Sequence, residues 1–114
     1  MIIRKENLEE LLIECPKEGR GILHRWDYIK EKIPCSGVLS FSYLELEPGS
    51  EIGYHQHVDT FEVYYITKGC GEINDGGGVS AVSEGYLIMT DKGKYHSLFN
   101  NGKERLSLIA FICS

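Results

Sequence analysis

Residues Gly49–Gly69, GSEIGYHQHVDTFEVYYITKG, concentrate metal-capable side chains in two β-rich runs. Side chains two positions apart in a strand point to the same face. In the first run, this alternation predicts Ile52 and Tyr54 on one face and His55 and His57 on the other. The two imidazoles are therefore expected to converge on one point.

A glutamate opens the second run. After a short connection, residues 61–67 are rich in β-forming side chains, and Glu62 lies near their start. This start is close in sequence to the end of the first run. We expect a hairpin that returns the Glu62 carboxylate to the side of the two imidazoles.

A second stretch, Gly85–Asn100, has the sequence GYLIMTDKGKYHSLFN and predicts a strand, a polar turn with glycine and another strand that opens with His96. Structural zinc sites usually draw on cysteine pairs or on histidines spaced along a helix. Here the candidates are three histidines and one glutamate on strands. Such nitrogen and oxygen ligands, without thiolate, suit divalent manganese, iron, cobalt, nickel or zinc.

Together the two stretches resemble the paired motifs of the cupin superfamily. The first motif, G-x5-H-x-H-x4-E-x6-G, is present in full, and the second, G-x5-P-x-G-x2-H-x3-N, has Asp91 in place of the usual proline. Asp is itself a good turn former. The sequences FEVYYITKG and TDKGKYHS are most similar to those of small one-domain cupins related to oxalate decarboxylase. The matching positions are Gly49, His55, His57, Glu62, Gly69, Gly85, Gly93, His96 and Asn100.

The resemblance implies a fold and a site. The fold is all-β, a single-domain double-stranded β-helix, also called a jelly roll or cupin barrel. The metal ligands carried over from the motifs are His55, His57, Glu62 and His96. Manganese is the first choice of metal, with iron, nickel, zinc and cobalt behind it.

Four protein ligands leave one or two positions open on an octahedral ion. Two open positions favour a small bidentate oxyanion such as oxalate, a related dicarboxylate or a keto acid. Two functions stay open: a metal-dependent oxidoreductase or decarboxylase, or a non-catalytic module that binds a metal or a small molecule. A metal-free sugar epimerase is disfavoured because it has no need for a complete ligand set.

An enzyme also needs an acid or base besides the ligands. Decarboxylating relatives carry one as a glutamate on a flexible lid. Glu18, Glu31 and Glu51 lie in or near expected loops, but none belongs to a motif. The catalytic residues are left unassigned.

The 114 residues are expected to form one domain, 1–114, with an N-terminal arm over 1–20 and the barrel over 21–114. Within the arm, residues 1–3 suggest an edge strand. Asn7 and Glu10 form a capping box that predicts a short helix, and Pro16 is expected to end it near Cys15. In the barrel, short strands recur with turn signals at the spacing typical of a β-sandwich or barrel.

The run Gly21–Ile29 alternates like a strand, with His24 and Trp26 on one face and Arg25 and Asp27 on the other. His24 has no place in the family motifs. It is interpreted as a histidine of the barrel wall that is hydrogen-bonded to a neighbour. Trp26 is expected to pack rather than to bind substrate.

Composition limits the partners and the location. A net charge of −5 without a basic cluster argues against nucleic acid and anionic membranes. No apolar run is long enough for a spanning helix, and the N-terminus has no signal-peptide core, so a cytoplasmic protein is expected. The four cysteines are scattered and are predicted to be free and mostly buried. By analogy with small cupins, we expect a homodimer.

Overall fold

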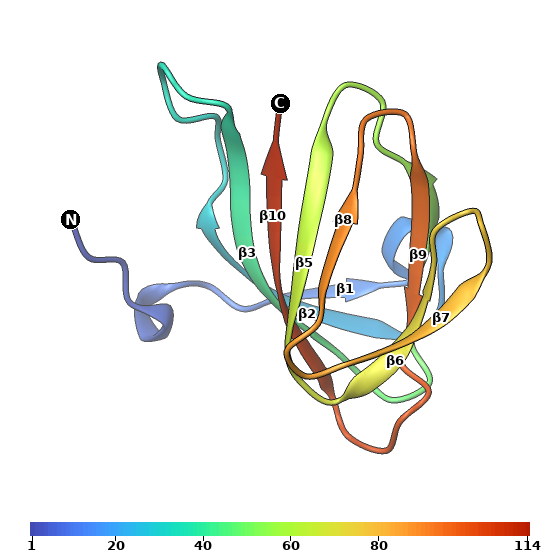
Figure 1. Cartoon of the computed structure of the whole chain (residues 1–114). Helices are drawn as coiled ribbons and strands as arrows, with labels where there is room; N and C mark the ends of the chain where they lie inside the picture. Colours follow the sequence, from blue (N-terminus) through green and yellow to red (C-terminus); the bar gives the residue numbers. More distant parts are fainter.

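Ten antiparallel strands form two sheets that face each other in the computed structural model, which describes all residues from Met1 to Ser114 (Figure 1). One sheet has six strands in the order β1-β2-β3-β10-β5-β8, and the other has four in the order β4-β9-β6-β7. The all-β jelly-roll prediction is confirmed. No helix in the chain is long and apolar enough to cross a membrane. The strands are β1 Leu11–Glu14, β2 Ile22–Ile29, β3 Val38–Leu46, β4 Glu51–Gln56, β5 Phe61–Lys68, β6 Cys70–Asn74, β7 Val79–Ser83, β8 Leu87–Thr90, β9 Tyr95–Phe99 and β10 Leu106–Cys113.

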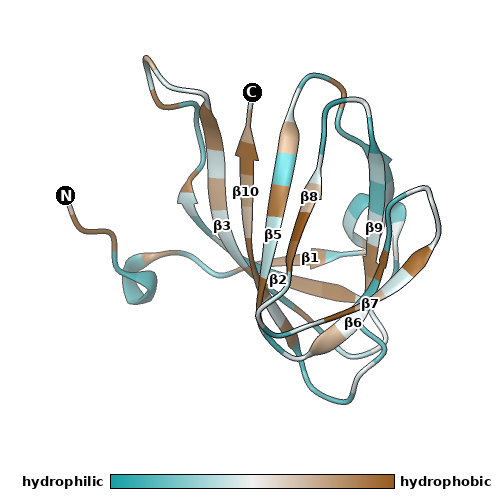
Figure 2. Ribbon diagram, in the orientation of Figure 1, coloured by the Kyte–Doolittle hydropathy of each residue, from teal (hydrophilic) through white to brown (hydrophobic).

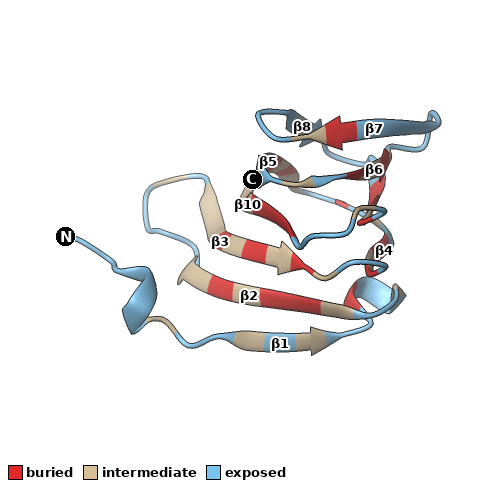
Figure 3. Ribbon diagram, turned by 90° about the horizontal axis from the view of Figure 1, so that it is seen from below, coloured by how far each residue is buried: buried red, intermediate tan, exposed pale blue.

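The hydrophobic core lies between the two sheets. Alternate residues of a strand point inward, and the buried positions of β3 recur at every second residue (Figure 3). Fully buried aliphatic side chains come from both sheets, and each contributes about 1.5–3 kcal/mol through burial. They fill one end of the barrel and leave the other end for the polar cluster described below. The most completely buried are Leu46, Ile66, Leu98, Leu106 and Leu108.

The N-terminal helix predicted from the capping box was wrong. Leu11–Glu14 is strand β1, which pairs with β2, and helical geometry is limited to a single 3-10 turn at Lys5–Asn7. Residues 1–3 form no strand. A cap contributes only about 1 kcal/mol, whereas the strand satisfies its backbone on β2 and packs Ile13 against the core.

The predicted hairpin between the two runs of the first motif was also wrong. β4 pairs with β9 in the smaller sheet, whereas β5 pairs with β10 and β8 in the larger one. The connection between them therefore crosses from one sheet to the other. Glu62 approaches the histidines across the barrel interior instead of from a neighbouring strand.

The cysteines are free, but the prediction that they are mostly buried was wrong. Cys15, Cys35 and Cys70 are exposed, and Cys113 is half-buried. Cys15 and Cys35 lie outside the strands with positive φ, so their side chains are at the surface rather than in the core.

Candidate metal centre

Three imidazoles and one carboxylate meet at one end of the barrel interior. The smaller sheet supplies His55 from β4 and His96 from β9, the larger sheet supplies Glu62 from β5, and His57 follows β4 directly. One ligand atom from each residue lies within 4.8 Å of the others. The Nε2 atom of His96 lies 3.1 Å from Nε2 of His55 and of His57. The four residues named from the sequence are thus all brought together.

A bulge in β4 turns His55 inward. Ile52 pairs with Leu98 and His55 pairs with His96, so three steps on β4 match two on β9. This extra residue changes the predicted alternation. Ile52 faces the interior together with His55, while Tyr54 is 52% exposed instead of sharing the face of Ile52.

His57 is held in place by the turn between β8 and β9. Its backbone N–H donates to the carbonyl of Lys94, and its carbonyl accepts the N–H of Gly93 at 2.6 Å. Gly93 has φ of +77°, a conformation that glycine adopts without strain. Asp91 closes the same turn, because its carbonyl accepts the N–H of Lys94 and its carboxylate accepts the N–H of Lys92. Asp91 therefore serves the turn where the motif usually has proline.

The outer nitrogen of each imidazole is already engaged. His55 Nδ1 donates to the carbonyl of Gly53 at 2.7 Å, which leaves the Nε2 lone pair free toward the centre. His96 Nδ1 lies 2.7 Å from the hydroxyl of Thr90, and His57 Nδ1 lies 3.3 Å from that of Thr60. Such contacts fix ring orientation at metal sites.

Glu62 stays ionised in this environment. Burial would raise its pKa, but the close polar contacts and charges of His57 and His96 outweigh burial and lower the pKa to about 2. Both Nε2 atoms lie 3.1 Å from Glu62 Oε1, yet no N–H is aligned with this oxygen, which remains a buried acceptor without a hydrogen-bond partner. The pKa of His55 is lowered, chiefly by burial, which favours its neutral form.

An ionised carboxylate with one oxygen that lacks a hydrogen-bond donor, together with inward-facing imidazole nitrogens, forms a ligand set that a divalent cation fits. Tyr64 adds a rigid wall, since its ring stacks on His96 with centroids 4.8 Å apart. Its hydroxyl is fully buried, and burial followed by the nearby charge of Glu62 raises its pKa. The tyrosine is therefore neutral at ordinary pH.

The cluster opens into a cavity of about 510 Å³. One wall is apolar and includes Leu23, Leu44 and Ile112, while His55, His57 and Glu62 line the metal end. A volume in this range is typical of small-molecule pockets. The candidate metal site is therefore accessible to a ligand larger than water.

Sequence reasoning missed a polar group on the larger sheet. Arg25 and Asp27 of β2 line the cavity together with Ser42 of β3. The Ser42 hydroxyl donates to Asp27 Oδ1 at 2.6 Å, and Arg25 Nε lies 3.1 Å from the same oxygen. The alternation of β2 already placed the two charged residues on one face, and only the closure of the barrel shows that this face is internal.

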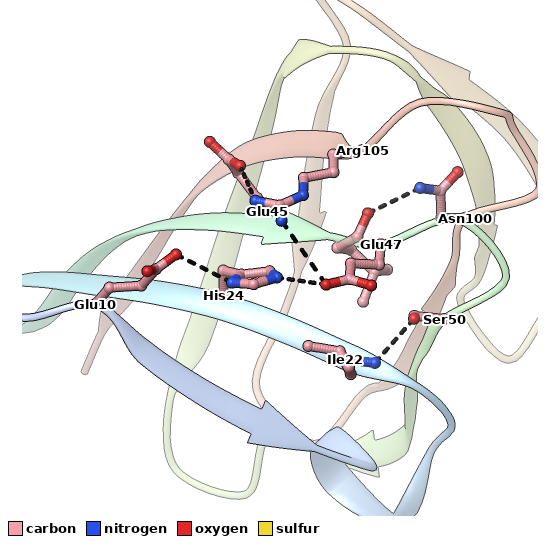
Figure 4. Close-up of polar contacts among 9 residues, drawn as sticks. Glu10, Ile22, His24, Glu45, Glu47, Ser50, Asn100 and Arg105 are labelled. Atoms are coloured by element: carbon pink, nitrogen blue, oxygen red, sulfur yellow. Dashed lines mark hydrogen bonds and ion pairs between the residues drawn. The ribbon is translucent and has the colours of Figure 1, made fainter.

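His24 lies on the outer face of β2, away from the cavity. Its Nδ1 lies 3.1 Å from Glu10 and its Nε2 lies 2.6 Å from Glu47, so a doubly protonated ring can donate to both carboxylates (Figure 4). The ring is buried, and Trp26 stacks beside it. The interpretation of His24 as a hydrogen-bonded wall histidine is confirmed, as is the packing role of Trp26.

None of the three glutamates considered as lid residues lines the cavity. Glu51 forms an ion pair with Arg20, at 3.7 Å, and Glu18 lies in the short turn before β2. Glu31 is exposed in the connection between β2 and β3. The carboxylates that do line the cavity are those of Asp27 and Glu62.

Asn100 ends the second motif as a structural residue. Its side chain is fully buried, donates to the carbonyls of Leu46 and Glu104, and accepts the N–H of Gly102. These bonds fasten the turn between β9 and β10 to the end of β3. The second motif thus supplies a residue of the metal cluster, His96, and also the turns that position the cluster.

A two-sheet antiparallel barrel with a His and Glu cluster inside one end defines a class of small β-barrel proteins with a candidate open metal centre. The chain belongs to the cupin family: residues 42–112 match the model of the cupin domain. This finding agrees with the motifs and with the topology.

The similar proteins include oxalate-related cupins. An oxalate-binding protein of Thermotoga maritima is 30% identical over 112 residues, which cover 98% of this chain and 93% of that protein. The crystal structure of a predicted oxalate decarboxylase from Thermotoga maritima has a TM-score of 0.93 and 29% identity, covering 99% of this chain and 98% of that chain.

More distant structures share the fold alone. A cupin 2 conserved barrel domain protein from Rhodopseudomonas palustris is 16% identical with a TM-score of 0.78, covering 95% of this chain and 72% of that chain. The similarity to the Thermotoga proteins extends over nearly the whole chain, and these are the relatives from which a function can be proposed.

Proposed function

We propose that this protein binds a small bidentate oxyanion, such as oxalate or a related dicarboxylate or keto acid, at a divalent metal ion held by His55, His57, Glu62 and His96. Manganese is the proposed metal, with iron, nickel, zinc and cobalt as alternatives. The observation that carries the proposal is the buried Glu62 oxygen that lacks a hydrogen-bond partner and faces the imidazole nitrogens. The oxalate-binding relative supports the choice of ligand class.

A bound metal would supply Lewis-acid polarisation of the carboxyl or carbonyl oxygens of the ligand. The protein's own residues prepare the site for this role. Glu62 provides a negative charge that needs no deprotonation at neutral pH, since its pKa is about 2. Tyr64 and aliphatic side chains line the cavity beside the cluster, and apolar surroundings of this kind strengthen polar contacts.

Titration calorimetry with oxalate tests the proposal directly. Manganese-loaded protein should bind oxalate at about one ion per chain, and the metal-free protein should bind it at least tenfold more weakly. Equal affinity with and without metal would contradict the proposal. A Glu62→Gln variant, which keeps the size of the side chain but removes its charge, should lose metal and oxalate binding together.

A non-catalytic binding module is the alternative to an enzyme. Asp27 is the cavity carboxylate outside the metal cluster. Its Oδ1 atom accepts the hydroxyl of Ser42 and lies 3.1 Å from Nε of Arg25. Such an engaged carboxylate is a weak candidate for general acid or base work. An assay of oxalate consumption by the manganese-loaded protein separates the two functions, because the module binds oxalate without turnover.

We further propose a homodimer in the cytoplasm. The outer face of the larger sheet carries aromatic and aliphatic side chains on β2, β3, β10, β5 and β8. Figure 2 shows that hydrophobic residues are frequent along β3, β10, β5 and β8. A second copy would cover this face. Free cysteines, three of them exposed, favour a reducing compartment.

A further inference from the structure

We propose that Arg25 is the anchor for a second carboxylate, so that the preferred ligand is a 2-oxo or 2-hydroxy diacid longer than oxalate. This inference rests on the proposed metal-dependent binding of an oxyanion and adds the far half of the ligand. It follows from the shape, the charge and the polar groups of the cavity beyond the metal cluster.

The cavity has two polar ends. One is the metal cluster, and the other is the group of Arg25, Asp27 and Ser42. Asp27 pairs with Ser42, Ser42 with Ala110, and Ala110 with Tyr64, so one inner row crosses the larger sheet from β2 to β5. That row spans three strand spacings, roughly 14 Å between the outermost backbones, and the side chains that reach inward from both ends shorten the gap that a ligand has to bridge. Ala110 lies in the middle of this row, and the cavity lining also includes the aliphatic Leu23, Leu44 and Ile112.

The guanidinium of Arg25 has N–H donors without hydrogen-bond partners. Its Nε lies 3.1 Å from Asp27 Oδ1 but is not aligned for a hydrogen bond, so this buried nitrogen has no partner. The Asp27 oxygen already accepts the Ser42 hydroxyl. A guanidinium offers five N–H donors in a planar fork that matches a carboxylate. The side chain is 39% exposed, which leaves the fork accessible from the cavity.

The charge of the cavity favours an anion. Lys17, Arg25 and Lys30 line it, against two acidic residues, Asp27 and Glu62. Lys17 and Lys30 are exposed at the rim. The whole chain carries a net charge of −5, so the local excess of cations around the cavity is opposite in sign to the charge of the protein as a whole. A divalent ion at the cluster would increase the excess. Two separated cationic centres with an apolar span between them suit a diacid with an aliphatic middle.

The size of the cavity also favours a ligand longer than oxalate. About 510 Å³ falls in the range for drug-sized ligands, and an oxalate ion at the metal end leaves most of that space empty. A ligand that chelates at one end and carries a carboxylate at the other fills the space and reaches Arg25.

The test compares 2-oxoglutarate with 2-oxopentanoate. Both have five carbons and the same chelating 2-oxo acid, but 2-oxopentanoate lacks the second carboxylate. By calorimetry on manganese-loaded protein, 2-oxoglutarate should bind about tenfold or more tightly than 2-oxopentanoate. Arg25→Gln should bring the ratio close to one while leaving 2-oxopentanoate affinity within about twofold. Arg25→Lys, which keeps a point charge without the fork, should give an intermediate ratio.

Arg4→Gln is the matched control, because it removes the same charge from the exposed N-terminal arm. It should leave both affinities unchanged. Equal binding of the two acids by the native protein, or an unchanged ratio in Arg25→Gln, would overturn the role of Arg25 while metal-dependent binding of 2-oxopentanoate still supports the metal site. If neither acid nor oxalate binds the loaded protein, the proposed function and this inference both fail.

Discussion

At the scale of single residues, the site depends on side chains that hold the imidazoles rather than on the imidazoles alone. Thr90 and Thr60 contact the outer nitrogens of His96 and His57, and the Gly53 carbonyl does the same for His55. Each contact selects the ring orientation that directs Nε2 to the centre. The proposed metal affinity is therefore sensitive to residues that never touch the ion.

Thr90→Val tests this dependence. The replacement has nearly the same shape but removes the hydroxyl 2.7 Å from His96 Nδ1, so manganese affinity should fall about tenfold. Competition with a fluorescent chelator measures the change. Thr67→Val on β5, which removes a hydroxyl away from the cluster, should leave affinity unchanged. If both substitutions lowered manganese affinity equally, the cause would be general destabilisation of the protein, and the proposed role of Thr90 would be contradicted.

Acid should destabilise the metal-free protein progressively. The pKa of folded His55 lies below its ordinary value of 6.5, and that of Glu62 is about 2 instead of 4.5. The unfolded chain therefore binds protons first, so the stabilising contributions are complete above pH 6.5 and are lost as pH falls through the folded pKa values. Denaturant unfolding at about pH 7, 5.5 and 4 should show a steady decline.

Two variants separate these contributions. His55→Gln should reduce the decline that begins below pH 6.5, and Glu62→Gln should reduce the decline below pH 4.5. A free energy of unfolding that does not change with pH in the native protein would contradict the described environment of the cluster.

At the scale of elements, the turn between β8 and β9 couples the second motif to the first. Gly93 and Lys94 hydrogen-bond to the backbone of His57, across 36 residues or more of sequence. The contact explains why a glycine and a histidine far apart in the chain belong to one site. The turn acts as a support for the ligand rather than as a passive connection.

Gly93→Ala should weaken this support. A Cβ there meets nothing within 4 Å, so the cost comes from the positive φ alone, about 1 kcal/mol of stability. Metal affinity should fall as well, because His57 moves with the turn. Gly85→Ala is the control, with a φ of +88° and the same open space but no bond to His57. It should lose stability and keep metal affinity; the same affinity loss in both would contradict the coupling.

The sequence predicted the barrel and named the four side chains that the structure brings together, because motif spacing and strand alternation are local properties. The bulge between Ile52 and His55 was not predictable, since an extra residue in one strand becomes visible only when the partner strand β9 is known. The same holds for β4 and β5, which alternate like a hairpin but pair with strands far away in sequence. Sheet partners are set by burial across the whole molecule, not by adjacency.

The N-terminal error has a different cause. Asn7 and Glu10 satisfy the local rule for a helix start, whereas in the structure Leu11–Glu14 is a strand whose residues are half-buried and exposed in turn. Pairing with β2 decided between the two patterns. Arg25 was missed because a charged residue on an alternating strand is usually on the surface, and only the closed barrel shows that its face is internal.

At the scale of the whole molecule, the outer face of the larger sheet carries an apolar surface that is left without a partner over β10, β5 and β8. Phe111 lies near its centre on β10, with Phe41 on one neighbouring strand and Val63 on the other. Leu87 and Met89 on β8 are more than half exposed. We expect this face to be covered in solution.

Light scattering should give about twice the 12.9 kDa mass of one chain. Phe111→Glu, which places a charge in the centre of the face, should reduce the mass to that of a monomer. Val79→Glu changes an exposed apolar residue on β7 of the other sheet and should leave the mass unchanged. A native protein that remains monomeric at high concentration would contradict the proposed dimer.

The central claim is that one metal ion is shared by His55, His57, Glu62 and His96, and metal content measured on two histidine variants tests it most directly. After reconstitution with manganese and removal of excess, elemental analysis should find about one ion per chain in the native protein and in His24→Ala, and a small fraction of that in His57→Ala. Both histidines are buried, so the comparison controls for lost packing. No retained metal in the native protein, or full metal content in folded His57→Ala, would contradict the claim.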